Sequence, residues 1–305
     1  CCGYRNGFDT QGLWVEVEVE KELGFKNKKD VENYGMDKFT KKCVERLKRF
    51  SSVITEQSKR LGQWMDWSNS YFTHTDENIS AIWSFLKVCN ERKWIAKSNR
   101  PMPWCPRCGT SLSEHEMSGS YKEITHKSVF CIAKLKDAEF DVLVWTTTPW
   151  TLSANVALAV NKDLDYAVVK CEGFEKPIVL AKNAIKYIDG EKQVLKLLKG
   201  SDLLGYEYET FFPWLDVQKG ITHKIVPWED VDANEGCGVV HIAPGCGAED
   251  FEIGKTLSLP QICPINELGI FEENYDFLSG KAAPEVANLV FEKLKEQGKL
   301  FKVME

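Results

Sequence analysis

The chain has 305 residues, of which 43% are hydrophobic, and this is enough to build the core of one large domain or two ordinary ones. Its formal net charge of −6 gives phosphates no global attraction, so any contact with nucleic acid requires local basic patches. No apolar run approaches the roughly 18 residues of a membrane helix, and the amino-terminal sequence lacks the pattern of a secretory signal, so we expect neither a membrane span nor secretion.

Residues 1–117 form the first of two predicted domains. A glycine-rich turn at residues 7–12 leads into alternating valine and glutamate side chains over residues 15–20. Alternation is the period of a strand, but the charged face also suits an exposed helix, so both interpretations of this segment stay open. Apolar side chains then recur at helical spacing over residues 37–61 and again over residues 76–94. Those two segments predict a pair of amphipathic helices.

Prolines and cysteines interrupt the helical pattern at residues 100–109. Cys105 and Cys108 form one Cys-x-x-Cys pair, which is half of a zinc knuckle because a structural zinc normally takes four ligands. His115 is a further candidate ligand, and a reduced, metal-free turn is the alternative. The chain's eleven cysteines are an odd number scattered through apolar runs, which is typical of reduced thiols in the cytoplasm.

Residues 118–305 form the second predicted domain, where the sequence changes to short β-rich runs separated by Gly, Pro and Asp. We expect strands at residues 128–135, 141–145, 155–160, 166–170, 178–180, 221–226 and 238–242. Helices are expected after Asp250 and after Pro284. Many short strands with turn residues between them indicate a barrel or a sandwich. The predicted fold is therefore mixed α/β, a β-barrel-like domain with flanking helices that follows a helical segment.

A run of hydroxyl side chains surrounds one proline at residues 145–155, which read W-T-T-T-P-W-T-L-S-A-N. A turn at the end of a strand can aim several short donors and acceptors into one pocket, and this suits a small polar ligand and an ordered water. Taken alone, the same run also fits a strand followed by a hydroxyl-capped turn.

A histidine ends a predicted strand in a second run, residues 236–250, which read G-C-G-V-V-H-I-A-P-G-C-G-A-E-D. A glycine-rich loop follows His241, and Glu249 and Asp250 stand where a helix should begin. Acids in a first helical turn ordinarily interact with the helix dipole and its free N–H groups. A lone histidine at a strand end is also more often structural than catalytic. Neither run identifies a function by itself.

Together, the two runs resemble the editing domain of isoleucyl-tRNA synthetases, in which a segment W-T-T-T-P-W-T-L-P-x-N precedes a segment G-x-G-x-V-H-x-A-P-G-x-G-x-x-D. Valyl and leucyl enzymes carry an arginine after two threonines, where this chain has Thr148, so the resemblance is to the isoleucyl branch. Residues 7–13, 60–66 and 105–116 resemble further stretches of the same family in the same order. The first of these stretches belongs to the family's catalytic Rossmann domain, which implies a partial Rossmann-type segment here.

The resemblance implies an editing site that hydrolyses mischarged valyl-tRNA. Asp250 would anchor the α-ammonium group of the substrate, and His241 would shape the pocket and hold substrate or water. Thr146, Thr147 and Thr148 would line the same pocket. These five residues are the implied catalytic set. The residues expected to contact the substrate are Asn155, Trp150 and Asp9.

Editing of this kind needs no cofactor. The implied partners are tRNA(Ile) with its aminoacylated 3′ end, valine and isoleucine, and the resemblance implies a monomer with no membrane contact. A full-length protein of the family would ligate isoleucine to tRNA(Ile) with ATP and magnesium. Neither ATP-handling signature, H-I-G-H or K-M-S-K-S, occurs in the 305 residues, so activation of isoleucine is not expected of this chain. Gln11 and Trp14 stand where the family has His and Pro, which puts the neighbouring aminoacylation site in doubt.

Two alternatives from other classes stay open. The chain could be a non-catalytic tRNA-binding piece whose basic clusters at residues 41–42, 46–49 and 92–93 touch phosphates, although charges on predicted helices are ordinarily solvated. It could also be a decayed synthetase kept for a structural role, which Gln11 and Trp14 would fit. Deacylation of mischarged valyl-tRNA separates both alternatives from an editing hydrolase.

Overall fold

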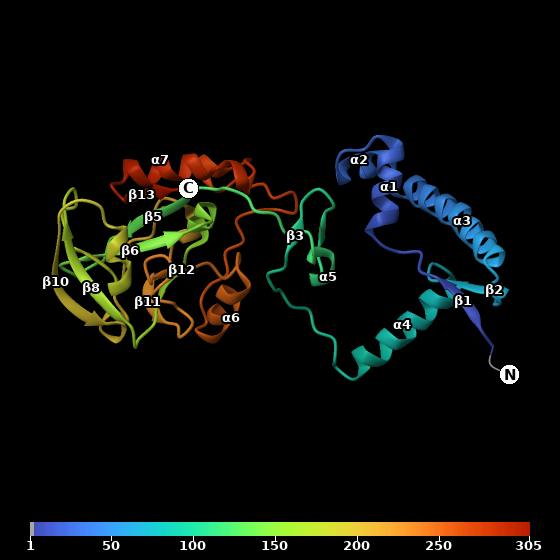
Figure 1. Ribbon diagram of the computed structural model, residues 1–305, viewed down its shortest axis with the longest axis horizontal. Helices are drawn as coiled ribbons and strands as arrows, with labels where there is room; N and C mark the ends of the chain where they lie inside the picture. The colour runs from blue at the N-terminus through green and yellow to red at the C-terminus, as the bar shows by residue number, and fades with distance from the viewer. Residues whose placement is uncertain (1–2) are drawn as a thin grey trace. The chain divides into compact units, whose positions relative to one another are not determined.

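The computed structural model describes residues 3–305, and their contacts divide them into two compact units. The first unit comprises the residues up to Asn99 together with Trp104–Thr110, and the second comprises Arg100–Pro103 and Ser111–Glu305. Figure 1 labels the elements of both units. No helix among the described residues is long and apolar enough to span a membrane.

The first unit contains two parallel strands and the helices that connect them. Its elements are β1 Arg5–Phe8, α1 Leu13–Leu23, α2 Lys28–Tyr34, α3 Met36–Arg60, β2 Asp66–Phe72 and α4 Asp76–Glu91. β1 pairs with β2 in parallel, which requires a long crossover connection, and α1 to α3 supply it. The two predicted amphipathic helices are confirmed as α3 and α4. A parallel pair joined by a helical crossover is the unit from which Rossmann-type sheets are built, and the assignment of this segment to a Rossmann domain stays a prediction.

The alternating valines and glutamates form a helix, α1, and not a strand. Val15 and Val19 lie one helical turn apart and are 3% and 1% exposed. Val19 packs in a small core with Val31 of α2 and Phe39 of α3. An alternating pattern also places like residues four positions apart, and the helix uses that spacing to bury one face.

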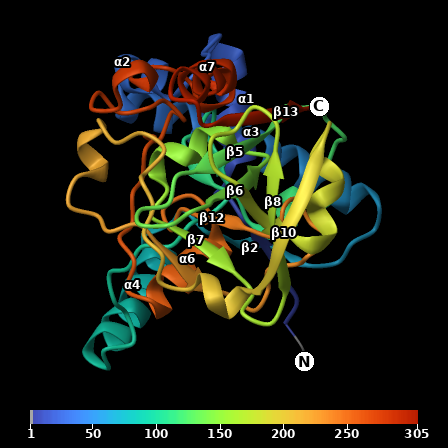
Figure 2. The same cartoon turned by 90° about the vertical axis from the view of Figure 1, so that its left-hand side faces the viewer.

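The second unit is a nine-stranded sheet that curls into half of a barrel. Its strands are β5 Ser128–Ala133, β6 Asp141–Thr146, β7 Ala157–Val160, β8 Asp165–Cys171, β9 Ile178–Ala181, β10 Lys192–Lys199, β11 Lys224–Pro227, β12 Val240–Ile242 and β13 Leu300–Met304. The strand order is β10-β8-β9-β6-β12-β7-β11, and β5 pairs with both β6 and β13. β6 has three neighbours, because β9 pairs with its first two residues and β12 pairs with Trp145 near its end, both opposite β5. Figure 2 shows β6 between β5 and β12. This sheet confirms the predicted barrel-like, mixed α/β fold.

Short helices accompany the sheet. They are α5 Glu114–Met117, α6 Ala248–Thr256 and α7 Ala287–Glu296, and two short strands, β3 Trp104–Cys105 and β4 Thr110–Ser111, flank the Cys-x-x-Cys turn. The helix expected after Asp250 begins two residues earlier, at Ala248, and the one expected after Pro284 is α7. α7 packs against β13 and against a 3-10 helix, η1, which spans Pro149–Ala154. The pattern of the sequence did not predict α2, β10 or β13.

Candidate functional site

The threonine-rich run lies where β6 ends. Thr146 is the last residue of β6 and is buried, whereas Thr147 and Thr148 are exposed. Pro149 then begins η1, a position that suits proline because its fixed φ and its missing N–H are tolerated in a first helical turn. The proline therefore turns the chain sharply and leaves the threonines at the edge of the sheet.

Strand β12 brings the histidine beside this run. Val240 pairs in parallel with Trp145 of β6, and β12 pairs antiparallel with β7 on its other side. His241 is the next residue and is only 7% exposed. The loop after β12 leads into α6, which carries Asp250 in its first turn. The two runs thus meet at the carboxyl end of β6.

A cavity of about 480 Å³ lies where the two runs meet. Its lining includes all five residues that the sequence implied as catalytic, which are Thr146, Thr147, Thr148, His241 and Asp250. The fold therefore gathers in one cavity side chains that the sequence separates widely.

Hydrogen bonds assign the tautomer of the histidine. The Thr151 hydroxyl donates to the carbonyl oxygen of Thr148 at 2.7 Å, and a carbonyl can only accept. The same hydroxyl oxygen lies 2.9 Å from His241 Nε2, so Nε2 carries the hydrogen and donates to Thr151. The other ring nitrogen, Nδ1, then holds a lone pair, and it is buried with no hydrogen-bond partner among the described residues. His241 thus keeps one buried acceptor atom that no described residue uses.

Burial keeps this histidine neutral. It lowers the pKa of His241 from its ordinary 6.5 to about 4, because the charged imidazolium loses its hydration in the protein interior. At neutral pH the side chain therefore accepts a hydrogen bond from water or from a hydroxyl group, and it does not act as a cation.

Asp250 is held by the loop that follows β12. Its Oδ2 accepts a hydrogen bond from the Ala243 N–H at 2.9 Å. It does not cap α6, because the N-cap position is Gly247 and no side chain bonds to the helix end there. Burial raises the pKa of the Asp250 carboxyl, and the bond from Ala243 opposes that rise. The carboxylate forms no ion pair with any described residue.

The cavity is acidic, and most of its acidic lining was missed in the sequence. Besides Asp250, its carboxyl groups belong to Asp230, Asp232, Glu235 and Glu249, and no lysine or arginine lines it within the described chain. Trp145, Trp228 and three valines supply apolar surface. Such a cavity favours a ligand with a positive charge and a small apolar group, and it disfavours phosphate. The acidic run W-E-D-V-D at residues 228–232 was the available signal.

Two of the three residues expected to contact the substrate, Asn155 and Trp150, do not line the cavity. Asn155 is fully buried behind the run, where its amide donates to the Ala157 carbonyl at 2.8 Å and accepts from the Tyr208 hydroxyl at 2.6 Å. Trp150 packs against the core, and neither Asn155 nor Trp150 lines the cavity. Asp9 is exposed and belongs to the first unit. As a correction to the expectation, Asn155 and Trp150 support the run from the inside.

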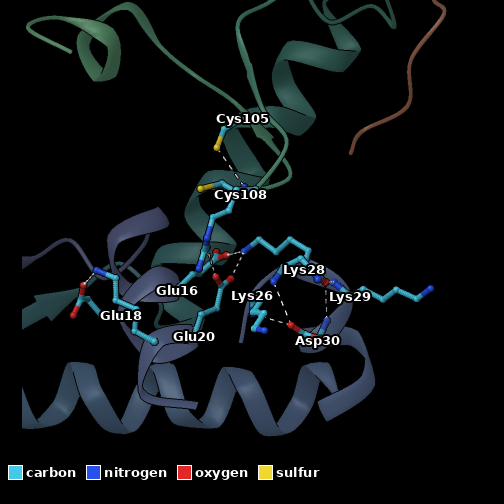
Figure 3. Close-up of polar contacts among 12 residues, drawn as sticks. Glu16, Glu18, Glu20, Lys26, Lys28, Lys29, Asp30, Cys105 and Cys108 are labelled. Atoms are coloured by element: carbon cyan, nitrogen blue, oxygen red, sulfur yellow. Dashed lines mark hydrogen bonds and ion pairs between the residues drawn. The ribbon is translucent and has the colours of Figure 1, made fainter. Parts of the chain in front are cut away.

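In the first unit, a buried carboxylate holds the Cys-x-x-Cys turn against α1 (Figure 3). Arg107 lies between Cys105 and Cys108 in the sequence and pairs with Glu20, whose side chain is 0% exposed. Lys28 pairs with the same carboxylate at 2.9 Å. The Cys108 N–H donates to Cys105 Sγ at 3.4 Å. The turn is therefore fixed by ion pairs that need no metal.

The two thiols supply half of a tetrahedral zinc set. Within residues 3–305, no group of three or more His, Cys, Asp or Glu side chains is placed to hold a metal ion. His115 is exposed on α5, in the second unit. Burial raises the pKa of the Cys108 thiol, with a contribution from its neighbour Cys105.

Comparison with known proteins identifies the family. The sequence profile described as tRNA synthetases class I (I, L, M and V) matches residues 2–299, so the chain belongs to the class I tRNA synthetases. Within that class it is similar to isoleucine–tRNA ligases: those of Clostridium acetobutylicum and Clostridium novyi are 38% and 39% identical over 98% of this chain, and that of Picrophilus torridus is 38% identical over 97%. The chain spans 29% of the length of each of these relatives.

Among solved structures, the chain is similar to the editing domain of the cytosolic leucyl-tRNA synthetase of P. knowlesi. That likeness has 10% sequence identity and a TM-score of 0.44, and it covers 61% of this chain and 98% of the other. A second structure, GlLeuRS-CP1, is 11% identical with a TM-score of 0.48, over 59% of this chain and 100% of the other.

Proposed function

We propose that the second unit is an editing hydrolase that cleaves the ester bond of mischarged valyl-tRNA(Ile). The observation that carries the proposal is the acidic cavity whose lining brings together Asp250, His241 and the three threonines of residues 146–148. The relatives named isoleucine–tRNA ligase support the choice of tRNA, and the small apolar part of the lining supports a small aliphatic side chain.

Asp250 is proposed to bind the α-ammonium group of the aminoacyl ester. An ammonium group that enters a half-enclosed cavity loses water, and an opposite charge at contact distance offsets that loss. Asp250 suits this role because it is a half-buried carboxylate without an ion-pair partner in the described structure. The other four carboxyl groups of the lining add a favourable field for the cation and keep the phosphates of the tRNA at the mouth.

The threonine hydroxyls and His241 are proposed to position the attacking water. The oxygen of water forms a bond to the ester carbonyl carbon, the bond from that carbon to the ribose oxygen breaks, and the ribose oxygen takes up a proton, so that free valine and tRNA leave. His241 Nδ1 can accept a hydrogen bond from the water or from the neighbouring ribose hydroxyl. Thr147 and Thr148 are exposed to the same space and offer short donors. Positioning of this kind can supply much of a rate enhancement.

A second, hydrolytic site of this type improves the discrimination between isoleucine and valine. Isoleucine and valine differ by one methylene, and a binding pocket exploits that difference by only about 1–3 kcal/mol, a magnitude for which isoleucyl enzymes are the usual example. A hydrolytic cavity that admits valine and excludes isoleucine by size removes the errors that remain.

The alternative of a non-catalytic tRNA-binding piece has less support. Two of its three basic clusters lie on α3, where Lys42 pairs with Glu45 at 2.8 Å and Arg46 pairs with Glu22, and the third, residues 92–93, follows α4. Lys41 lies 3.9 Å from Asp37. A lysine or arginine that already pairs with an acidic side chain on the same face binds a phosphate group only weakly.

For the whole protein we propose ligation of isoleucine to tRNA(Ile) with ATP and magnesium, as a monomer in the cytoplasm. The family match supports the reaction class, and the nine cysteines that the structure describes, all of them free thiols, suit a reducing compartment. The editing reaction itself is proposed to need no cofactor. A structural zinc at Cys105 and Cys108 would need two more ligands than this turn offers.

The proposal is tested by incubating the purified chain with valyl-tRNA(Ile) and, in parallel, with isoleucyl-tRNA(Ile). We expect valine to be released well above the spontaneous rate and isoleucine to be spared. Spontaneous rates for both substrates, from a chain whose circular dichroism shows a folded sheet, would overturn the proposed function.

A further inference from the structure

A buried polar network behind the threonine-rich run takes no part in the proposed chemistry. It consists of Tyr208, Gln218 and His223, which are 1%, 4% and 4% exposed. We propose that these three side chains are positioning residues that hold Thr151 against His241. The predicted effect on the rate of hydrolysis rests on the proposed function, whereas the predicted effect on the tautomer of His241 does not.

Tyr208 fixes the residue at which η1 ends. Its hydroxyl donates to Asn155 Oδ1 at 2.6 Å, and the amide nitrogen of Asn155 donates to the Ala157 carbonyl at the start of β7 at 2.8 Å. Both ends of the amide are therefore used, and Asn155 cannot turn without leaving a buried polar group unpaired. Since Asn155 is the C-cap residue of η1, this bridge sets where the 3-10 helix ends.

Gln218 and His223 hold the same end of η1 through its backbone. Gln218 Nε2 donates to the carbonyl oxygen of Ser153 at 2.7 Å. His223 Nε2 lies 2.8 Å from Gln218 Oε1 and 3.2 Å from the carbonyl oxygen of Asn155. Both of those oxygens accept, so Nε2 carries the hydrogen and donates to them. Two carbonyls at the end of η1 are thus bonded to side chains that come from outside the run.

The contact with the cavity lies within the same short helix. The Thr151 hydroxyl is 2.7 Å from the Thr148 carbonyl and 2.9 Å from His241 Nε2. η1 is only six residues long, and 3-10 helices have poor hydrogen-bond geometry, so its position depends on what surrounds it. None of the three network residues lines the cavity. A break in the network is therefore expected to act on the rate through Thr151 and to leave the contacts with substrate in place.

The first test compares Tyr208→Phe and Gln218→Met, each of which removes hydrogen bonds with little change in volume, with a control. The control is Asp141→Ala, which removes the bond from the Leu135 N–H to Asp141 at the opposite end of β6 from Thr146. We measure kcat and KM for valyl-tRNA together with the melting temperature. Both network variants should lower kcat about tenfold or more and change KM by less than about twofold. The control should lose thermal stability and keep its kcat.

The second test observes the histidine without any reaction. In the unaltered chain, ¹⁵N NMR should show His241 protonated at Nε2 and not at Nδ1, and the two network variants should show a mixture of both tautomers. An unaltered chain that fails to hydrolyse valyl-tRNA sinks the proposed function, yet the spectrum still tests the positioning. A single Nε2-protonated signal in both variants, or a kcat that follows melting temperature in all three variants alike, overturns the proposal.

Discussion

The cavity of the second unit and the turn of the first unit both bury ionisable side chains, but they leave them in opposite states. Around Glu20, Lys28 and Arg107 supply two cations to one fully buried carboxylate. In the cavity, the Asp250 carboxylate has a backbone N–H and no cation, and His241 Nδ1 has no partner among the described residues. Ionisable groups that are paired within the fold stabilise the structure. Groups that have no hydrogen-bond or ion-pair partner in the fold are available to a ligand.

The contrast separates two kinds of motif that look equally functional in the sequence. The Cys-x-x-Cys turn has its position set by ion pairs from α1 and α2, and it offers half of a metal site. The threonine-rich and histidine runs gather polar groups around empty space. The predictions below vary these two regions, in order of the expected effect on the free energy of unfolding.

Removing both cations around Glu20 should have the largest effect. The variant with Lys28→Ala and Arg107→Ala leaves a carboxylate that is 0% exposed without a counter-charge, which costs about 3–5 kcal/mol. Adding Glu20→Gln to that variant should recover most of the loss, because the buried charge is gone. Native-state hydrogen exchange over α1 measures both changes. If the double variant stays within about 1 kcal/mol of the unaltered chain, the pairing is not what holds the turn.

His241 should make the second unit less stable in acid. Its pKa is lowered in the folded state, so the unfolded chain binds the proton first, and stability falls as pH drops from 6.5 to about 4. The loss amounts to about 3 kcal/mol relative to His241→Gln, which keeps a donor near Thr151 and does not titrate. His223, whose pKa burial also lowers, is present in both proteins and cancels. Urea titrations at several pH values check this, and parallel curves for the two proteins would refute it.

Thr151 should matter less for stability and still be visible. Thr151→Val removes the oxygen to which His241 Nε2 donates, which leaves a buried N–H unpaired at a cost of about 1–3 kcal/mol. Thr151→Ser keeps the hydroxyl and should recover most of this loss. Thermal melts of the two variants give the comparison, and equal destabilisation by both would show that the lost hydrogen bond does not account for the effect of Thr151→Val.

The thiol pair should show no effect of metal removal. Because Cys105 and Cys108 offer two ligands, we expect elemental analysis to find no tightly held zinc and a chelator to leave the melting temperature unchanged. One equivalent of zinc that survives dialysis against a chelator would mean that further ligands take part.

The sequence predicted those parts of the fold that depend on local pattern. The spacing of apolar residues located α3 and α4, and the short apolar runs located most strands of the sheet. It did not reveal β10, whose residues are exposed on both faces and so show no alternation. It left residues 15–20 undecided, because the cation that helps to bury Glu20 is Arg107, which lies 87 residues away.

The candidate site shows the same limit. The resemblance to a known family predicted five residues that line the cavity, because the motifs of that family contain the side chains of its site. It also predicted that Asn155 contacts the substrate, and only the fold shows that its partner is Tyr208, from a distant loop. The acidic lining escaped notice because Asp230 and Asp232 follow β11, a strand whose place beside β7 no local pattern fixes.

The measurement that tests the account most directly is the single-turnover hydrolysis of valyl-tRNA(Ile) by Asp250→Asn, set against its melting temperature. Burial raises the pKa of this carboxyl, so the charge opposes folding at neutral pH, and asparagine can still accept the bond from Ala243. The account predicts unchanged or higher stability together with a loss of about 2–5 kcal/mol of binding energy in the reaction, which is a rate lower by roughly thirtyfold or more. A folded Asp250→Asn chain that hydrolyses valyl-tRNA at the normal rate would contradict it.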